Sequence, residues 1–380
     1  MNKKNEQANL SCKDRSDFDC CNLTVDSLFG MSISTKDIEV LQKWSPSAGY
    51  ALNRIPGIVA AADGSLLVYW EARTSKKNDT EPADIEVWRS ADNGASFTKI
   101  LTLGDQETTK YTNPVMVVDQ EQTVHLLYTS KTGEDGVYHT VSKDHGQTWS
   151  APINIIDAFQ RDKIGWDMVN LGPGHGICLK AGAYKGRILF SAWCHTRTSY
   201  DVYTLYSDDN GITWRLGDRA EGNYNETAIA ELSDSSVMLN SRQYGVPYDV
   251  PAHLFVHETR PASAAEAYRC ITVSDTGIGG WSDMSMDTVL QNPAVQGSLC
   301  STTVNGQHVL LYSGCDSKTA RVNLSVRWSV DDGKTWSLPI QIVNQAAYSD
   351  LVVVNNTVCV IYESQPNQDL YLVAFPRRNP

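Results

Sequence analysis

The chain has 380 residues, more than one compact hydrophobic core usually holds, so we expect two domains, a barrel or a repeat architecture. With 41% hydrophobic and 20% charged residues, its composition is that of an ordinary globular protein and excludes wholesale disorder. The formal net charge of -12, without any run of Lys or Arg, argues against a nucleic-acid partner, and no apolar run is long enough to span a membrane.

Residues 1–44 are polar and contain cysteines. We expect them to form an N-terminal extension, or to include the start of a closing strand, ahead of a single catalytic domain over residues 45–380. The first residues are basic but lack a following apolar segment, which predicts a cytoplasmic protein, or a secreted one whose signal peptide has been removed. The nine cysteines form no CxxC pair, so neither a metal site nor a cofactor is expected.

A short element recurs six times along the chain: a polar turn followed by β-branched residues or leucines. Each copy predicts a strand entered from a tight turn. The six predicted strands cover residues 66–69, 124–128, 188–190, 237–239, 308–312 and 358–362.

A second repeat, S-x-D-x-G-x-T-W or a close variant, interleaves with the first. Copies begin at Ser90, Ser142, Ser207 and Ser329, and a degenerate copy begins at Ser274. In such a turn we expect the Asp to accept hydrogen bonds from nearby backbone N–H groups and the Gly to take a positive φ. A calcium loop is the rival interpretation, but the glutamate expected near its twelfth position is missing in every copy.

The copies recur at intervals of about 50 to 70 residues, which is typical of propeller blades of four strands each. The sequence therefore predicts an all-β fold, a six-bladed β-propeller. These turns, known as Asp boxes, also occur in binding proteins, so they indicate the fold and leave the function open.

The segment Asn53-Arg54-Ile55-Pro56 resembles the F/Y-R-I-P motif of bacterial sialidases, and Glu71-Ala72-Arg73, Asp79 and Asp84 follow it in the order of that family's first blade. The resemblance implies that Arg54 is the first of three arginines that bind the substrate carboxylate. It also implies that Asp79 is the acid/base and that Arg73 lies in the sugar pocket. Asp84 competes with Asp79 for that role, although either could simply cap a turn.

A second cluster, Asn225-Glu226 to Glu231 with Arg242 after it, is similar to the family segment whose Glu polarises a nucleophilic Tyr. The match to the family motif implies Glu231 for this role, with Glu226 as the alternative. The resemblance places the second arginine at Arg269, although Arg242 or Arg260 could be mistaken for it.

The run Val295-Gln296-Gly297-Ser298 is also similar to a sialidase motif, and the resemblance then assigns four further positions. Arg321 is the third arginine, Tyr348 the nucleophile, Glu363 the partner of the first arginine and Asn113 a pocket residue. Arg327 and Tyr362 are the alternatives for the third arginine and the tyrosine, and His175 is a candidate for contact with the sugar's glycerol tail.

Sialic acid carries a carboxylate on its anomeric carbon, which arginines can bind through bidentate hydrogen bonds and which would repel a carboxylate nucleophile. Sialidases therefore use a Tyr nucleophile. The resemblance implies a retaining exo-α-sialidase acting on sialylated glycans, glycoproteins or oligosaccharides. The alternatives are a non-catalytic glycan-binding propeller, an enzyme for another nonulosonic acid, or a trans-sialidase. The motifs do not indicate the oligomeric state, the glycosidic linkage or the preference at C5.

Overall fold

The computed structural model describes residues 38–76, 81–132, 136–196, 199–243, 267–355, 357–366 and 369–375. Over these residues the chain is built from strands, together with a one-turn 3-10 helix, η3 (Ile156–Phe159), and one short α-helix, α2 (Arg161–Ile164). The predicted all-β class is confirmed. No helix in these ranges is long and apolar enough to cross a membrane.

Four antiparallel sheets follow one another along the chain. The first sheet contains β2 (Leu52–Ala60), β3 (Leu66–Arg73), β4 (Ala83–Ser90) and β5 (Thr98–Leu103). The second contains β6 (Tyr111–Val118), β7 (Val124–Ser130), β8 (Gly136–Ser142) and β9 (Ile153–Asn154), with β11 (Gly174–His175) parallel to β6. The third contains β10 (Met168–Leu171), β13 (Ile188–His195), β14 (Tyr200–Ser207) and β15 (Arg215–Leu216), with β12 (Ile177–Cys178) beside β13. The fourth contains β16 (Tyr224–Glu231), β17 (Val237–Gln243), β18 (Tyr268–Ser274) and β19 (Ser285–Gln291).

The last sheet has seven strands and joins the two ends of the described chain. It contains β20 (Ser298–Val304), β21 (Gln307–Cys315), β22 (Val322–Ser329), β23 (Ile340–Val354), β24 (Thr357–Ser364), β25 (Leu370–Phe375) and β1 (Glu39–Trp44). The first part of β23 pairs with β22 and its last part pairs with β24. Because β1 pairs with β25, residues 39–44 belong to this sheet and not to an extension.

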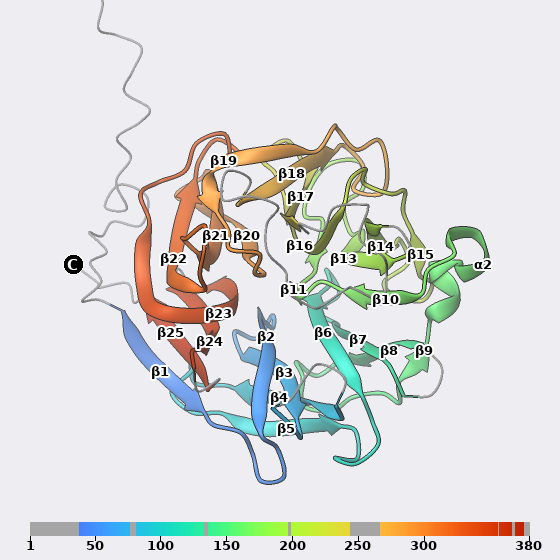
Figure 1. Cartoon of the computed structure of the whole chain (residues 1–380), viewed down its shortest axis with the longest axis vertical. Coiled ribbons are helices and arrows are strands. Elements are labelled where there is room, and N and C mark those ends of the chain that lie inside the picture. The colour runs from blue at the N-terminus through green and yellow to red at the C-terminus, as the bar shows by residue number, and fades with distance from the viewer. Residues whose placement is uncertain are drawn as a thin grey trace, which may run out of the picture.

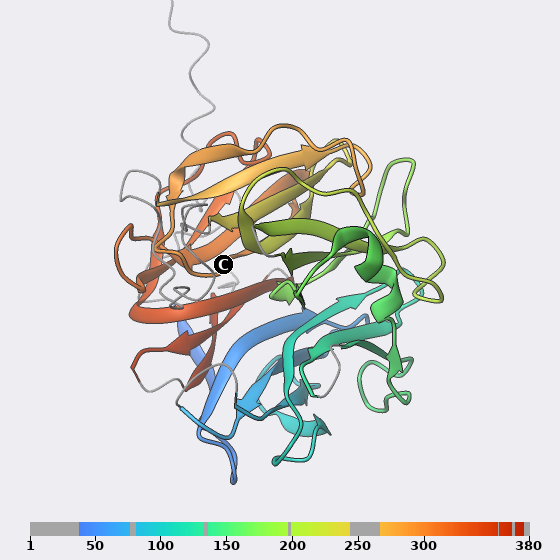
Figure 2. The same cartoon turned by 45° about the vertical axis from the view of Figure 1, so that its right-hand side comes forward.

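The sheets are arranged around a common centre, with β2, β6, β16 and β20 closest to it (Figure 1). A view turned by 45° shows the same propeller-like arrangement obliquely (Figure 2). The inner strands of successive sheets contact one another, as in the pairs β2 with β6 and β16 with β20, and β2 also contacts β23 of the last sheet.

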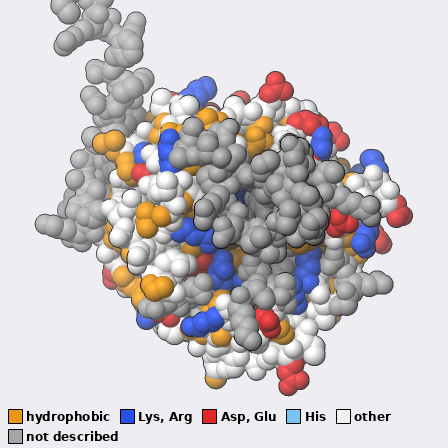
Figure 3. Space-filling model, in the orientation of Figure 1, with side chains coloured by type: hydrophobic (Ala, Val, Ile, Leu, Met, Phe, Trp, Pro, Cys, Tyr) orange, Lys and Arg blue, Asp and Glu red, His pale blue; other side chains and the backbone are white. Residues whose placement is uncertain are grey.

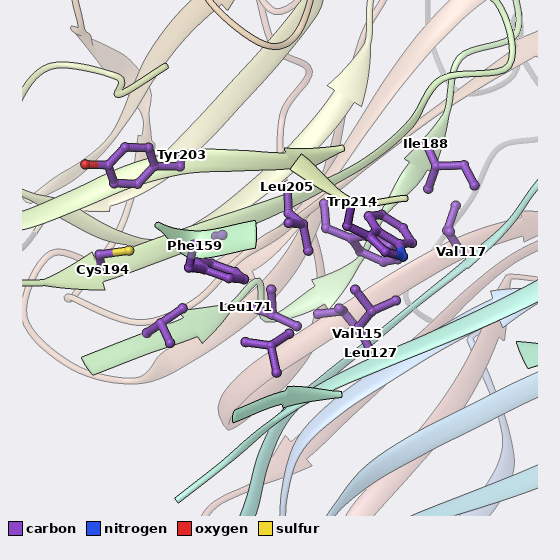
Figure 4. Close-up of a cluster of buried hydrophobic side chains, with 14 of the residues drawn as sticks. Val115, Val117, Leu127, Phe159, Leu171, Ile188, Cys194, Tyr203, Leu205 and Trp214 are labelled. Atoms are coloured by element: carbon purple, nitrogen blue, oxygen red, sulfur yellow. The ribbon is translucent and has the colours of Figure 1, made fainter. Parts of the chain in front are cut away.

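Apolar clusters fill the spaces between neighbouring sheets. One cluster joins Val115 and Leu127 of the second sheet to Leu171 and Trp214 in the region of the third (Figure 4). Another joins the first sheet to the last and includes Trp44 of β1. Burial of this apolar surface, worth about 25 cal/mol per Å², holds the inner strands in place around the centre.

The Asp-box turns have the predicted hydrogen bonds. In the first box Ser96 N–H donates to Asp92 Oδ1 at 2.9 Å, and Gly94 N–H donates to Ser90 Oγ at 2.8 Å with φ +87° at the glycine. The same bonds recur in the boxes that begin at Ser142, Ser207 and Ser329. Hydrogen bonds from Ser and from the backbone lower the pKa of the exposed Asp92 to about 2, so the turn is formed by an ionised carboxylate.

Candidate active site

Three inner strands carry a polar residue at their third position, at the edge of a β-bulge or inside one. These are Arg54 on β2, Asn113 on β6 and Glu226 on β16, and the pairing register shifts across each of them. Tyr348 lies in a fourth bulge, in the middle of β23. A bulge re-aims side chains that a regular ladder would direct alternately to the two faces of a sheet.

Tyr348 is the centre of the site. Its hydroxyl donates to Glu226 Oε1, and Arg242 Nη1 donates to the same hydroxyl oxygen at 3.2 Å and to Glu226 Oε2. Tyr348 is 5% exposed, so these bonds are largely shielded from water. A buried tyrosine, a carboxylate and a guanidinium therefore form one hydrogen-bonded unit.

Three guanidinium groups surround the Tyr348 side chain. The Cζ atoms of Arg54 and Arg321 lie 5.3 and 5.6 Å from the centre of its ring, and Arg242 binds its hydroxyl. Three cations held this close together repel one another, so the arrangement favours binding of an anion. Figure 3 shows Lys and Arg side chains near the centre of the face that is seen in Figure 1.

The Tyr348 hydroxyl resists ionisation. Burial, followed by the nearby Glu226 carboxylate, raises its pKa well above the ordinary value near 10, while the three arginines act in the opposite direction. Tyr348 is therefore a neutral phenol in the resting site. It can become a nucleophile only if its proton moves to a base, and Glu226 is in direct contact with it.

Arg54 is oriented by Glu363 on β24. Arg54 Nε lies 2.9 Å from Glu363 Oε1, and the backbone N–H of Ile55 donates to the same oxygen at 2.6 Å. Glu363 is fully buried. This pair, which the family resemblance implied, ties the β2 bulge to β24.

Arg73 and Asn113 meet through Glu71. Arg73 Nε donates to Glu71 Oε2 at 2.8 Å, and the Asn113 backbone N–H donates to Glu71 Oε1 at 2.8 Å. Glu71 is paired with Arg54 across the first two strands of the first sheet. Both predicted sugar-pocket residues thus lie beside the strand that carries Arg54.

The prediction that Glu231 polarises Tyr348 is wrong. Glu231 ends β16, five residues after Glu226, and at about 3.3 Å per residue it lies roughly 16 Å further along the strand. Its carboxylate accepts the backbone N–H groups of Lys180 and Ala181 at 2.8 and 3.0 Å. The match to the family motif led to Glu231. A usable signal for Glu226 is its place as the third residue of an inner strand, which Arg54 and Asn113 share.

The prediction that Arg269 completes the set of three arginines is also wrong. Its side chain is fully buried on β18 and donates to the Asn240 Oδ1 and backbone oxygen, to Val295 O and to Glu226 O. Burial lowers its pKa. Arg242 lies on β17, opposite the bulge that holds Glu226, and occupies the position expected for the second arginine; Arg260 lies outside the described residues.

The predicted acid/base, Asp79, lies outside the described residues. Its competitor, Asp84, is fully buried on β4 and accepts hydrogen bonds from Tyr50 Oη (2.7 Å), Thr109 Oγ1 (2.6 Å) and Gln106 N–H (2.9 Å). These donors lie in the segment before β2 and in the segment between β5 and β6. Asp84 therefore anchors loops, in line with the turn-capping interpretation.

The side chains of the remaining alternatives have partners other than Tyr348. Tyr362 stacks on Tyr371 at 5.6 Å within an apolar cluster, and Arg327 binds Asp316 and Ser337. His175 contacts the buried Asp350 at 2.8 Å. Over the described ranges, no group of three or more His, Cys, Asp or Glu side chains could hold a metal ion.

Comparison with known proteins gives one family and several relatives. Residues 64–361 match the model of the BNR repeat-like domain. A sialidase of Micromonospora viridifaciens is 28% identical over 83% of this chain and 50% of its own length, and one of Bacteroides fragilis is 26% identical over 82% and 60%. The chain thus spans about half to three-fifths of these two curated relatives.

Solved structures of low sequence identity share the fold. The Hadza microbial sialidase Hz136 aligns with a TM-score of 0.73 and 21% identity, over 88% of this chain and 68% of its own. The Trypanosoma rangeli sialidase aligns with a TM-score of 0.70 and 17% identity, over 86% and 55%.

Proposed function

The chain belongs to the family of BNR repeat-like domains, and we propose that it is a retaining exo-α-sialidase that hydrolyses terminal sialic acid from glycoconjugates. The observation that carries the proposal is the convergence of Arg54, Arg242 and Arg321 on Tyr348, whose hydroxyl is bound to Glu226. The named sialidase relatives are consistent with it.

The fold proposed with this function is a six-bladed β-propeller. The two four-stranded and two five-stranded sheets supply four blades, and the seven-stranded sheet supplies two, which share β23. One apolar cluster lies between Leu311 on β21 and Val373 on β25, two strands of that same sheet, as expected if the sheet folds back on itself at β23. β1 then closes the last blade.

In this proposal the three arginines bind the sugar carboxylate. Within the described part of the chain Arg321 has neither a hydrogen bond nor an ion pair. Its guanidinium lies over the Tyr348 ring, so its N–H donors are available to a ligand. Arg54 and Arg242 are held by Glu363 and Glu226. The two carboxylates fix the directions of these guanidinium groups and leave the site net positive.

Tyr348 would then attack the anomeric carbon while Glu226 takes its proton. A neutral nucleophile avoids repulsion by the substrate carboxylate, and the buried base makes the attack feasible although the Tyr pKa is raised. The covalent bond would form between Tyr348 Oη and the anomeric carbon as the glycosidic bond breaks. Asp79 would donate a proton to the leaving oxygen and later remove one from the water that releases the sugar. Two displacements at one carbon retain its configuration.

Turnover of an α-sialoside reporter tests the proposal. The wild-type chain should release sialic acid first as the α-anomer, and Tyr348→Phe should abolish this turnover with the fold intact. Tyr362→Phe is the matched control, because it removes a hydroxyl from a buried tyrosine outside the site. Near-wild-type retaining turnover by Tyr348→Phe would overturn the proposal.

The same assay separates the alternatives. Sialosides that differ at C5 test a preference for another nonulosonic acid, and added lactose tests transfer in place of hydrolysis. A wild-type chain that binds sialosides without turning them over would instead be a glycan-binding propeller.

A further inference from the structure

Asp350 follows Tyr348 by two residues on β23, and its carboxylate is fully buried. It accepts four hydrogen bonds, all within the described part of the chain. The donors are Ile58 N–H (2.9 Å), Leu351 N–H (3.0 Å), His175 Nδ1 (2.8 Å) and Ser298 Oγ (2.5 Å).

These donors come from four different strands. Besides β23 itself, they lie on β2 (Ile58), β11 (His175) and β20 (Ser298). One carboxylate therefore connects strands of the first, second and last sheets. A buried charge with this many donors is costly to lose, because each donor would remain buried without a partner.

The bond to Ile58 links two of the bulges that build the site. The β2 register shifts between Arg54 and Gly57, and Ile58 is the next residue. The β23 register shifts between Ala346 and Ser349, and Asp350 is the next residue. Asp350 thus joins the two strands at the second paired position after each register shift.

We propose that Asp350 is a positioning residue for catalysis, which sets the β23 bulge with Tyr348 against the β2 bulge with Arg54. It does not touch the reacting atoms, and it acts through the two strands it joins. Gln296 supports the same segment, since its Oε1 accepts the Ser349 N–H at 3.0 Å. The inference rests on the proposed sialidase function.

Asp350→Asn is the informative substitution, because it changes one atom without changing the size of the side chain. Both carboxylate oxygens face donors, so the new amide group must face a donor as well. If the amide nitrogen takes the place of Oδ2, it meets the Ile58 N–H and the bond between β23 and β2 is lost. Arg242 on β17 and Arg321, directly before β22, lie outside this pair of strands, and Arg242 is also held by Glu226.

The experiment is single-turnover hydrolysis of an aryl α-sialoside with enzyme in excess at saturating concentrations. The rate constant reports positioning within folded molecules as long as folded enzyme stays in excess over substrate, and circular dichroism reports the folded fraction. Asp350→Asn should lower the rate constant by about 100-fold, the order of loss that a displacement of about 1 Å produces. Its Kd for a 2,3-didehydro analogue of sialic acid should rise much less, because two of three arginines are undisturbed.

The matched control is Asp287→Asn. Asp287 is also a buried carboxylate, and it accepts Val289 N–H, Leu290 N–H and Trp336 Nε1–H on the outer strand β19. It should lower thermal stability and keep the wild-type rate constant. A wild-type rate constant in Asp350→Asn would overturn the inference, as would an equal loss in both variants.

Ser298→Ala provides a second test if Asp350→Asn fails to fold. It removes one donor from Asp350, and we expect a smaller loss in the same rate constant, on the order of tenfold. An unchanged rate constant in Ser298→Ala would then overturn the inference. Failure of the proposed function is distinguishable, because in that case the wild-type chain itself would not turn over the substrate.

Discussion

The Tyr348 hydroxyl donates a hydrogen bond to the carboxylate of Glu226, which lies 122 positions earlier in the chain and on another sheet. The contact depends on two β-bulges, one in β16 and one in β23. It places a base beside a phenol whose pKa is raised by burial and by that same carboxylate. The base and the phenol of the proposed nucleophile are thus already hydrogen-bonded before substrate binds.

Glu226→Gln should lower kcat by about 10²- to 10⁴-fold, because an amide cannot take the Tyr348 proton. Glu231→Gln should leave kcat near the wild-type value, since Glu231 binds only backbone N–H groups at the far end of β16. Steady-state kinetics with an aryl α-sialoside compares the two. Similar losses in both variants, or a larger loss in Glu231→Gln, would contradict the assignment.

Arg242→Lys should raise KM and lower kcat, because lysine loses the planar group that contacts both Glu226 and Tyr348. Arg269→Lys should act mainly on stability, with a loss of about 2 to 5 kcal/mol, because several buried acceptors lose their donor. Kinetics and urea unfolding of both variants separate the two roles. A raised KM with unchanged stability in Arg269→Lys would instead indicate that Arg269 binds the substrate.

Asp79→Ala should slow the hydrolysis of sialyllactose more than that of an aryl sialoside with an acidic phenol as leaving group. A good leaving group departs without protonation, whereas a sugar hydroxyl needs a general acid. Asp84→Asn should affect both substrates equally, because Asp84 anchors loops through three donors. Equal effects of Asp79→Ala on the two substrates would argue against its role as the acid.

A chain of hydrogen-bonded side chains that includes two buried histidines predicts that acid destabilises the fold. Trp214 Nε1–H donates to His139 Nδ1 (3.3 Å), so the His139 proton lies on Nε2, which faces His125 Nδ1 (3.0 Å), and His125 Nε2 faces Asp119 (3.1 Å). Burial, together with His125, lowers the His139 pKa to about 3. A proton on His139 Nδ1 would face the Trp214 N–H.

Because the folded pKa of His139 lies below the ordinary value of 6.5, its contribution to stability is complete above pH 6.5 and declines as the pH falls toward 3. Between pH 7 and 4.5, His139→Gln should lose about 2 to 3 kcal/mol less unfolding free energy than the wild type. Glutamine can accept from Trp214 and donate to His125 without titrating. Urea unfolding at both pH values checks this, and identical pH dependence in the two proteins would contradict it.

The fold was largely predictable because its signals are local. Each Asp box is a short turn whose Ser, Asp and Gly interact within a few residues, so the pattern of letters is sufficient. The pairing of β23 with both β22 and β24 was not predictable, because it depends on contacts between distant parts of the chain. A closing strand, which β1 provides, was one of two alternatives for residues 1–44.

The grouping of candidate residues was predictable where a motif marks a single residue, as for Arg54, Arg321, Tyr348 and Glu363, which the structure brings together. It was not where two residues of one type lie close in sequence. Glu226 and Glu231 differ by five positions on one strand, and only the bulge and the direction toward β23 distinguish them. Arg242 and Arg269 lie on adjacent strands, and the acceptors that bind Arg269 come from β17, from β16 and from the segment between β19 and β20.

Peptide mapping by mass spectrometry, after reaction of the wild-type chain with a 2,3-difluorinated sialic acid, tests the central claim most directly. The fluorine at C3 slows release of the sugar, so a covalent intermediate should accumulate. We predict a sialosyl adduct on Tyr348, absent from Tyr348→Phe and formed much more slowly in Glu226→Gln. An adduct on another residue, or none at all in a chain that turns over α-sialosides, would contradict the account.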